Sequence, residues 1–173
     1  MTSKSKKLLK VIDGLRAWNL AATILKSDHF HLGIIAKHGF PYQPSCMEFD
    51  PVQRILAVGT KNGCIKLFGR PGVEFHLEHP STAAVLQLIF LVNEGGLISI
   101  CRDDVVHLWN IRQKPPDIVH SLHFKRETLT CGYLAVSSSW LSVGSEQGNV
   151  HFVNVQHFST SGYVINWNRA INV

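Results

Sequence analysis

Cysteine and histidine are the residue types in this sequence with the widest range of possible chemistry. The 173-residue chain holds four cysteines and ten histidines. Zinc sites and redox pairs usually place such residues at short spacings, as in Cys-x-x-Cys. The four cysteines instead stand 18, 37 and 30 residues apart: Cys46, Cys64, Cys101 and Cys131. We therefore expect free, mostly buried thiols and no zinc or disulfide-exchange motif.

Three groups look at first like sets of metal ligands: the segment Asp28-His29-Phe30-His31 and two close histidine pairs, His76 with His79 and His120 with His123. Residues three apart in a strand point to opposite faces, so neither pair can readily share an ion. We therefore expect the protein to hold no metal and no cofactor.

Signatures of hydrolytic and phosphate chemistry are weak. In the segment 144–148 the serine follows the first glycine directly, which departs from the GxSxG nucleophile elbow. Asp103 and Asp104 could form a carboxylate pair for acid–base catalysis, but tight turns also require such residues. The sequence has no Walker A or dinucleotide-binding glycine motif. We expect a protein that is not an enzyme.

Positive charge is concentrated at the N-terminus. The formal net charge is +5, and residues 1–20 carry +4 of it, from five basic residues against Asp13. The nearly neutral remainder gives no basis for nucleic-acid binding, because tracking phosphates needs clustered Lys and Arg. The basic tail permits at most peripheral membrane contact. No apolar run approaches the roughly 20 residues that cross a bilayer, and no secretory signal is recognisable, so we expect a cytoplasmic protein.

Three similar segments repeat along the chain, at 57–68, 98–109 and 142–153. Each consists of an apolar stretch, a polar turn and a second apolar stretch whose apolar positions alternate, which is typical of strands. The turns at 61–63, 102–104 and 146–148 contain the Asn, Asp and Gly residues that tolerate positive φ. Each repeat therefore contains a β-hairpin.

Further apolar stretches flank each hairpin, and they complete a unit of four strands. They lie at 46–49, 85–92 and 129–134 before the hairpins and at 73–77, 118–124 and 163–166 after them. Four strands in a repeat of 41 to 44 residues match a propeller blade. We expect an all-β domain over 28–173, with four-stranded blades at about 45–80, 83–124 and 129–167, and another strand at 30–37. Residues 1–27 are expected to form a tail, either disordered or with a short amphipathic helix at 8–25.

The repeats share a residue spacing that resembles the spacing found in WD40 repeats. His38, His79 and His123 each stand 30 residues before Phe68, Trp109 and Val153 respectively. In WD40 repeats a loop histidine and a strand tryptophan are similarly separated, and the middle repeat also has an aspartate in its turn. Cys101 stands where the family usually has serine, and asparagine replaces the turn aspartate in the first repeat. The resemblance implies these structural positions: His38, Asn62, Phe68, His79, Cys101, Asp103 and Trp109.

Longer stretches, at 38–79, 86–122 and 140–171, are similar to the N-terminal part of the tomosyn family, in the lethal giant larvae superfamily of WD40 proteins. The likeness covers roughly 28–172 and includes Gly69-Arg70-Pro71-Gly72. It implies a non-enzymatic scaffold that regulates SNARE-mediated vesicle exocytosis from the cytoplasm, with peripheral association at the plasma membrane or secretory vesicles. Syntaxin-type SNAREs are the implied partners of the full-length family, with myosin II or a small GTPase as minor expectations.

The tomosyn family combines two propellers with a SNARE-like helix, for which this sequence has no matching heptad segment. We therefore expect a truncated form, from a short isoform or an incomplete gene model, that does not act as a SNARE mimic. Two alternatives remain open. One is a generic WD40 interaction adaptor, and the other is a propeller enzyme, which would need polar residues converging at a central channel.

Overall fold

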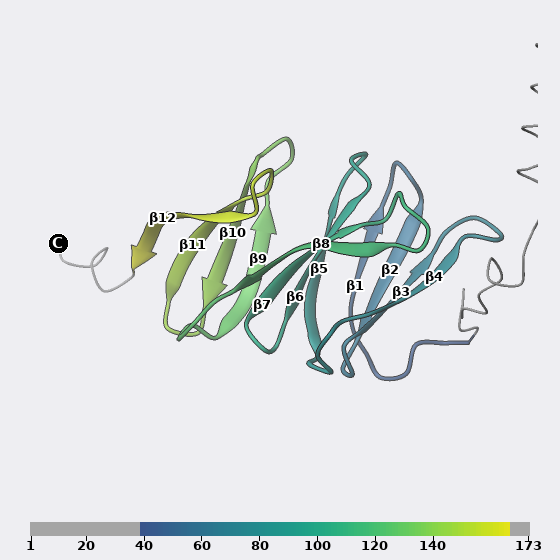
Figure 1. Cartoon of the computed structure of the whole chain (residues 1–173), viewed down its shortest axis with the longest axis horizontal. Helices are drawn as coiled ribbons and strands as arrows, with labels where there is room; N and C mark the ends of the chain where they lie inside the picture. Colours follow the sequence, from purple (N-terminus) through teal and green to yellow (C-terminus); the bar gives the residue numbers. More distant parts are fainter. Residues whose placement is uncertain (1–38, 167–173) are drawn as a thin grey trace, which may run out of the picture. The chain divides into compact units, whose positions relative to one another are not determined.

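The computed structural model describes residues 39–166, and strands are the only regular structure in that range (Figure 1). No helix among these residues is long and apolar enough to cross a membrane. The predicted tail at 1–27, the predicted strand at 30–37 and His38 lie outside the described residues. The strands are β1 (Pro44–Asp50), β2 (Ile55–Thr60), β3 (Cys64–Phe68), β4 (Glu74–Glu78), β5 (Val85–Leu91), β6 (Gly96–Cys101), β7 (Val105–Asn110), β8 (Asp117–His123), β9 (Leu129–Leu134), β10 (Trp140–Ser145), β11 (Asn149–Asn154) and β12 (Ser159–Asn166).

These strands form three antiparallel sheets, each a meander of four consecutive strands. The orders are β1-β2-β3-β4, β5-β6-β7-β8 and β9-β10-β11-β12. The first strands of consecutive sheets contact one another, β1 with β5 and β5 with β9. The sheets therefore stand side by side like neighbouring propeller blades, which confirms the predicted all-β fold (Figure 1). We call them the first, second and third blades.

The tight turn between the second and third strands of each blade has the predicted chemistry. Its third residue has positive φ, at Gly63 (79°), Asp104 (62°) and Gly148 (80°). The N–H of each of these residues donates to the carbonyl three positions earlier. Aspartate tolerates this left-handed conformation better than most residues with a side chain, so Asp104 can take the place that glycine has in the other two turns.

The core consists of two apolar layers, one on each side of the second blade. All six residues of β6 are buried, which fits their mostly apolar character, with Ser99 as the polar exception. Leu97 packs in the layer shared with the first blade, whereas Ile98 and Ile100 pack in the layer shared with the third. Alternation along one strand thus supplies both layers, and the second blade is covered on both faces.

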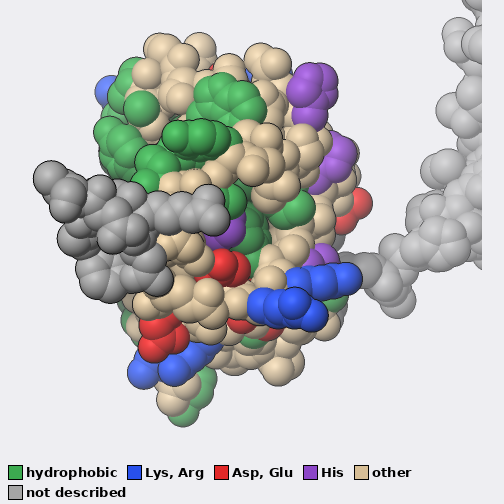
Figure 2. All heavy atoms as spheres, turned by 90° about the vertical axis from the view of Figure 1, so that its left-hand side faces the viewer, with side chains coloured by type: hydrophobic (Ala, Val, Ile, Leu, Met, Phe, Trp, Pro, Cys, Tyr) green, Lys and Arg blue, Asp and Glu red, His purple; other side chains and the backbone are tan. Residues whose placement is uncertain are grey.

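The outer blades each have one face without a neighbouring blade among the described residues. On the third blade, Tyr133, Trp140 and Tyr163 are exposed by 68%, 43% and 69%. Figure 2 shows hydrophobic side chains gathered on this side of the molecule. On the first blade, Met47 and Phe49 are similarly exposed. We call these two surfaces the third-blade open face and the first-blade open face.

Candidate functional site

A chain of hydrogen bonds connects the first two blades through His79, Ser99 and Trp109. The Trp109 indole N–H donates to Ser99 Oγ at 3.0 Å, and Ser99 Oγ lies 2.8 Å from His79 Nε2. His79 Nδ1 lies 2.6 Å from the carbonyl oxygen of Gly63. A carbonyl can only accept, so Nδ1 carries the hydrogen and Nε2 accepts the Ser99 hydroxyl proton. Every polar atom of the chain is satisfied, and it ties the turn of the first blade to two strands of the second.

Strand register places these groups together. Ser99 on β6 pairs with His107 on β7, and Trp109 lies two residues farther along the same face. His79, from the connection after β4, meets the edge of the Trp109 ring at 5.0 Å and the tilted His107 ring at 4.9 Å. Burial lowers the pKa of His79, and it lowers the pKa of His107 to about 4. Both imidazoles are therefore neutral near pH 7.

The structure places the predicted Cys101 and Asp103 beside this chain and not within it. The bridging hydroxyl belongs to Ser99, which the sequence analysis missed, although period two puts it on the same strand face as Cys101. Burial raises the pKa of the Cys101 thiol to about 12, and the nearby Asp103 carboxylate adds to the effect. Asp103 Oδ2 accepts a hydrogen bond from Ser81 at 2.6 Å, so it acts on His79 through its charge.

The third blade has no histidine at the place of His79. The N–H of Phe124 donates to the Asp104 carbonyl, just as the N–H of His79 donates to the Gly63 carbonyl. The predicted equivalence of His123 is therefore wrong by one residue. Phe124 packs with Val143 and Val153, which occupy the places of Ser99 and Trp109. The third blade fills this space with apolar contacts in place of hydrogen bonds.

The predicted positions in the first blade also lie away from the hydrogen-bond chain. Phe68 is half-buried, has no N–H in its ring, and lies with its ring centroid 6.0 Å from Lys66 Nζ. Asn62 Oδ1 accepts the Thr60 hydroxyl at 2.5 Å, within its own turn. His38, the third predicted position here, is outside the described residues.

The Ser99–His79 pair has the contact of a nucleophile and its general base, yet its surroundings favour a structural role. Ser99 is fully buried, and its oxygen already accepts the Trp109 N–H. A nucleophile must reach a substrate, and this hydroxyl lies inside the layer between two blades. The geometry supports a structural role for the Ser99–His79 pair and not a catalytic one.

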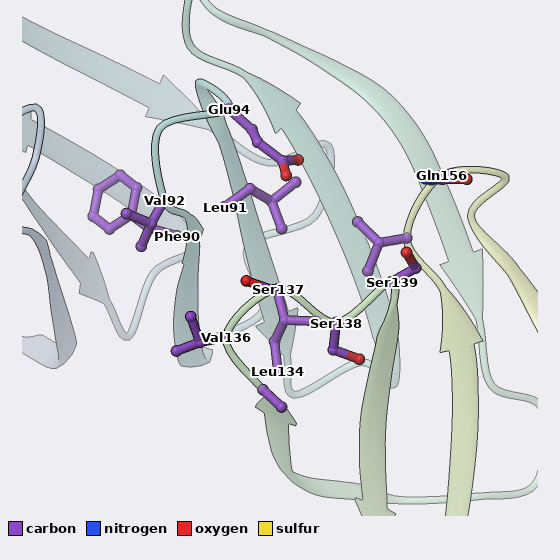
Figure 3. A pocket seen from close by; sticks show the side chains of 12 residues that line it. Phe90, Leu91, Val92, Glu94, Leu134, Val136, Ser137, Ser138, Ser139 and Gln156 are labelled. Atoms are coloured by element: carbon purple, nitrogen blue, oxygen red, sulfur yellow. The ribbon is translucent and has the colours of Figure 1, made fainter.

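A groove at the surface joins the second and third blades where their first hairpins turn (Figure 3). It encloses about 320 Å³ between the β5–β6 and β9–β10 connections. Val136 is 97% exposed and Val92 is 49% exposed on its two sides, and Ser137 to Ser139 add hydroxyl groups. Exposed apolar side chains rimmed by polar groups are typical of surfaces that bind other proteins.

Several known proteins are similar in sequence to this chain. No family model matches the sequence. A mouse protein, LLGL scribble cell polarity complex component 2, is 36% identical over 152 residues, which are 79% of this chain. Human Lethal(2) giant larvae protein homolog 1 is 46% identical over 87 residues, 50% of the chain. The chain is homologous to the lethal giant larvae proteins. It spans 14% of the mouse relative's length and 8% of the human one's.

Solved WD40 structures agree with the fold. The WD40 domain of Toxoplasma gondii coronin matches with a TM-score of 0.59 and 19% identity, over 70% of this chain and 33% of that one. The RRP9 WD40 repeats match with a TM-score of 0.62 and 14% identity, over 75% of this chain and 40% of that one. At such identities the likeness establishes the WD40 propeller fold alone.

Proposed function

We propose that the protein is a non-enzymatic scaffold that regulates SNARE-mediated exocytosis by binding other proteins through its blades. The observation that carries the proposal is homology to the lethal giant larvae proteins over 79% of the chain. The similarity of residues 38–79, 86–122 and 140–171 to the tomosyn family supports the narrower assignment to SNARE regulation. The mouse relative is named as a component of a cell polarity complex, which also supports a role within a protein assembly.

The groove between the second and third blades is the surface that we assign to the partner. Val92 and Val136 present apolar side chains that no neighbour covers completely, and hydroxyl groups beside them can fix a partner's backbone. In this proposal the partner is a syntaxin-type SNARE, which the blades contact directly and without a SNARE-like helix. The protein then works in the cytoplasm and associates peripherally with the plasma membrane or vesicles, to which the basic residues of 1–20 contribute.

The test is a binding titration of the purified chain with the cytosolic part of a syntaxin. Val136→Asp should weaken binding about tenfold, because it puts a charge into an apolar contact. Val119→Asp is the matched control, since Val119 is 50% exposed on β8 and does not line the groove. Absence of binding by the wild type would contradict SNARE regulation. Equal effects of the two variants would contradict the assignment of the groove.

A further inference from the structure

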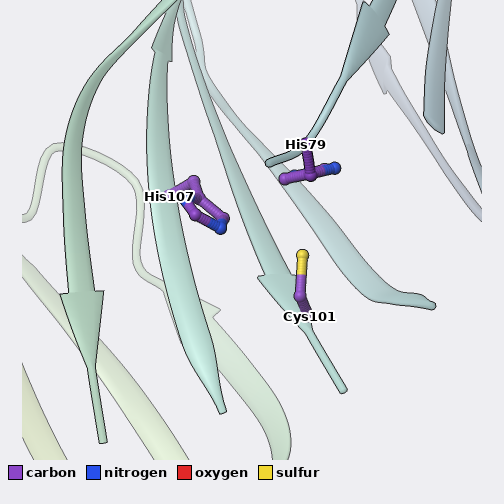
Figure 4. Close-up of side chains that lie close together, drawn as sticks. All are labelled: His79, Cys101 and His107. Carbon is purple, nitrogen blue, oxygen red and sulfur yellow. The ribbon is translucent and has the colours of Figure 1, made fainter. Parts of the chain in front are cut away.

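Three side chains with metal-binding atoms meet in the layer between the first two blades (Figure 4). His79, Cys101 and His107 each offer one ligand atom, and these atoms all lie within 4.8 Å of one another. All three residues are buried. They come from the connection after β4, the end of β6 and the middle of β7, so spacing in the sequence gave no sign of them.

Both histidine rings are held by their Nδ1 atoms. His79 Nδ1 donates to the Gly63 carbonyl at 2.6 Å, and His107 Nδ1 lies 2.8 Å from Ser121 Oγ. Histidines that bind metals usually have one ring nitrogen fixed in this way by a carbonyl or similar partner, which leaves the other to coordinate. Here the arrangement leaves Nε2 of each ring, and Nε2 of His79 currently accepts from Ser99.

The charge around the cluster favours a divalent cation. The Asp103 carboxylate acts electrostatically on His79, on Cys101 and on His107. A thiolate at Cys101 and this carboxylate together balance the two positive charges of such an ion. Thiolate with imidazole is a ligand set that suits Zn²⁺, with bonds of about 2.3 Å to sulfur and about 2.0 Å to nitrogen.

We propose that His79, Cys101 and His107 bind a Zn²⁺ ion that clamps the first blade to the second. Binding replaces the thiol proton of Cys101, which leaves to solvent, and it replaces the Ser99 hydroxyl at His79 Nε2. Ser99 keeps its hydrogen bond from Trp109. The site has three protein ligands, so one position of a tetrahedral ion stays open for a water molecule.

The experiment is titration of the metal-free 173-residue chain with Co²⁺, which reports thiolate coordination by a charge-transfer absorption, followed by competition with Zn²⁺. We expect one Co²⁺ per chain with this absorption. Cys101→Ser should abolish the absorption and weaken Zn²⁺ binding about a hundredfold, and His107→Gln should act similarly. An absence of the absorption in the wild type overturns the proposal, whatever the variants do.

Cys64→Ser and Cys131→Ser are the matched cysteine controls. Cys64 belongs to a second, less buried group with His76 and Glu78 whose ligand atoms also lie within 4.8 Å of one another, and Cys131 is exposed. Both variants should keep the absorption. If Cys64→Ser removes it while Cys101→Ser keeps it, the metal binds at the second group and the proposal is overturned.

Ser99→Ala separates coordination by His79 Nε2 from simple packing. The substitution removes the hydroxyl that competes for Nε2, so Zn²⁺ should bind about tenfold tighter, by roughly the net value of one hydrogen bond. Thermal unfolding of each metal-free variant checks that the fold persists. Weaker Zn²⁺ binding by a folded Ser99→Ala chain would contradict the use of this nitrogen.

Discussion

At the scale of single residues, one position of the blade holds a different side chain in each of the three blades. The place of Trp109 in the second blade is taken by Phe68 in the first and by Val153 in the third. A buried indole N–H needs an acceptor, and among the described residues Ser99 provides it. Tryptophan and serine in the second blade therefore occur together with histidine in the connection that precedes it. The equivalent positions at the third blade are all apolar: Val153, Val143 and Phe124.

Replacement of Trp109 tests how much the second blade depends on this chain of contacts. Trp109→Ala should reduce the free energy of unfolding by about 3 to 5 kcal/mol, because it leaves a cavity and removes the donor to Ser99. Trp140→Ala is the control and should cost less than about 1 kcal/mol, since Trp140 is 43% exposed while Trp109 is 3% exposed. Chemical denaturation of both variants measures the two losses. Similar losses in the free energy of unfolding would show that burial of the indole does not determine the cost of removing it.

At the scale of elements, the turn of the first blade is fitted against the connection that leads into the second. Gly63 has a φ of 79°, and a Cβ there would lie 2.7 Å from the Ser81 carbonyl oxygen and 3.0 Å from that of Ala83. Both atoms are backbone, so they cannot move aside cheaply. The same glycine accepts the His79 ring N–H. The turn is therefore part of the contact between blades as well as a link between strands.

Gly63→Ala should therefore destabilise the protein by more than the cost of placing an alanine in the left-handed backbone conformation of residue 63. A left-handed alanine costs about 1 to 2 kcal/mol, and overlap with the backbone should bring the total to about 3 kcal/mol or more. Gly72→Ala is the matched control, because Gly72 has a φ of 85° and open space around it. Thermal unfolding measures both changes. Equal shifts would mean that the connection relaxes around the new methyl group.

Local patterns predicted the elements well, and contacts between sheets were much harder to predict. Period-two alternation and turn residues act within a few positions, so Leu129–Leu134 appears at the predicted bounds. β12 begins earlier than predicted, at Ser159, since Gly162 has positive φ within it and interrupts the pattern. Phe124 was missed for a different reason. The packing of the second and third blades decides which residue of the connection after β8 enters the apolar layer between them. A difference of one position in the sequence therefore selects Phe124 in place of His123.

At the scale of the whole molecule, the described blades leave two dissimilar apolar surfaces at opposite ends of the stack. Propellers usually close with four to eight blades, and each blade then covers the next. Here the first-blade and third-blade open faces expose aromatic and aliphatic side chains, including Phe49 and Tyr163. The two faces differ, so contact between them is heterologous, and copies joined in this way form rings or extended chains.

Self-association through these faces is therefore the expected behaviour of the purified chain. Sedimentation velocity over a wide range of concentration should show oligomers that grow with concentration, because apolar patches and sheet edges favour association. The double variant Trp140→Lys with Tyr163→Lys should shift the chain to monomer by charging the third-blade open face. Val119→Lys is the control: Val119 on β8 is about as exposed as Trp140, and its replacement should leave association unchanged.

Only one of the two faces needs to be charged in this test, since a heterologous contact uses the third-blade open face of one copy and the first-blade open face of another. A wild-type chain that stays monomeric at every concentration would contradict this prediction.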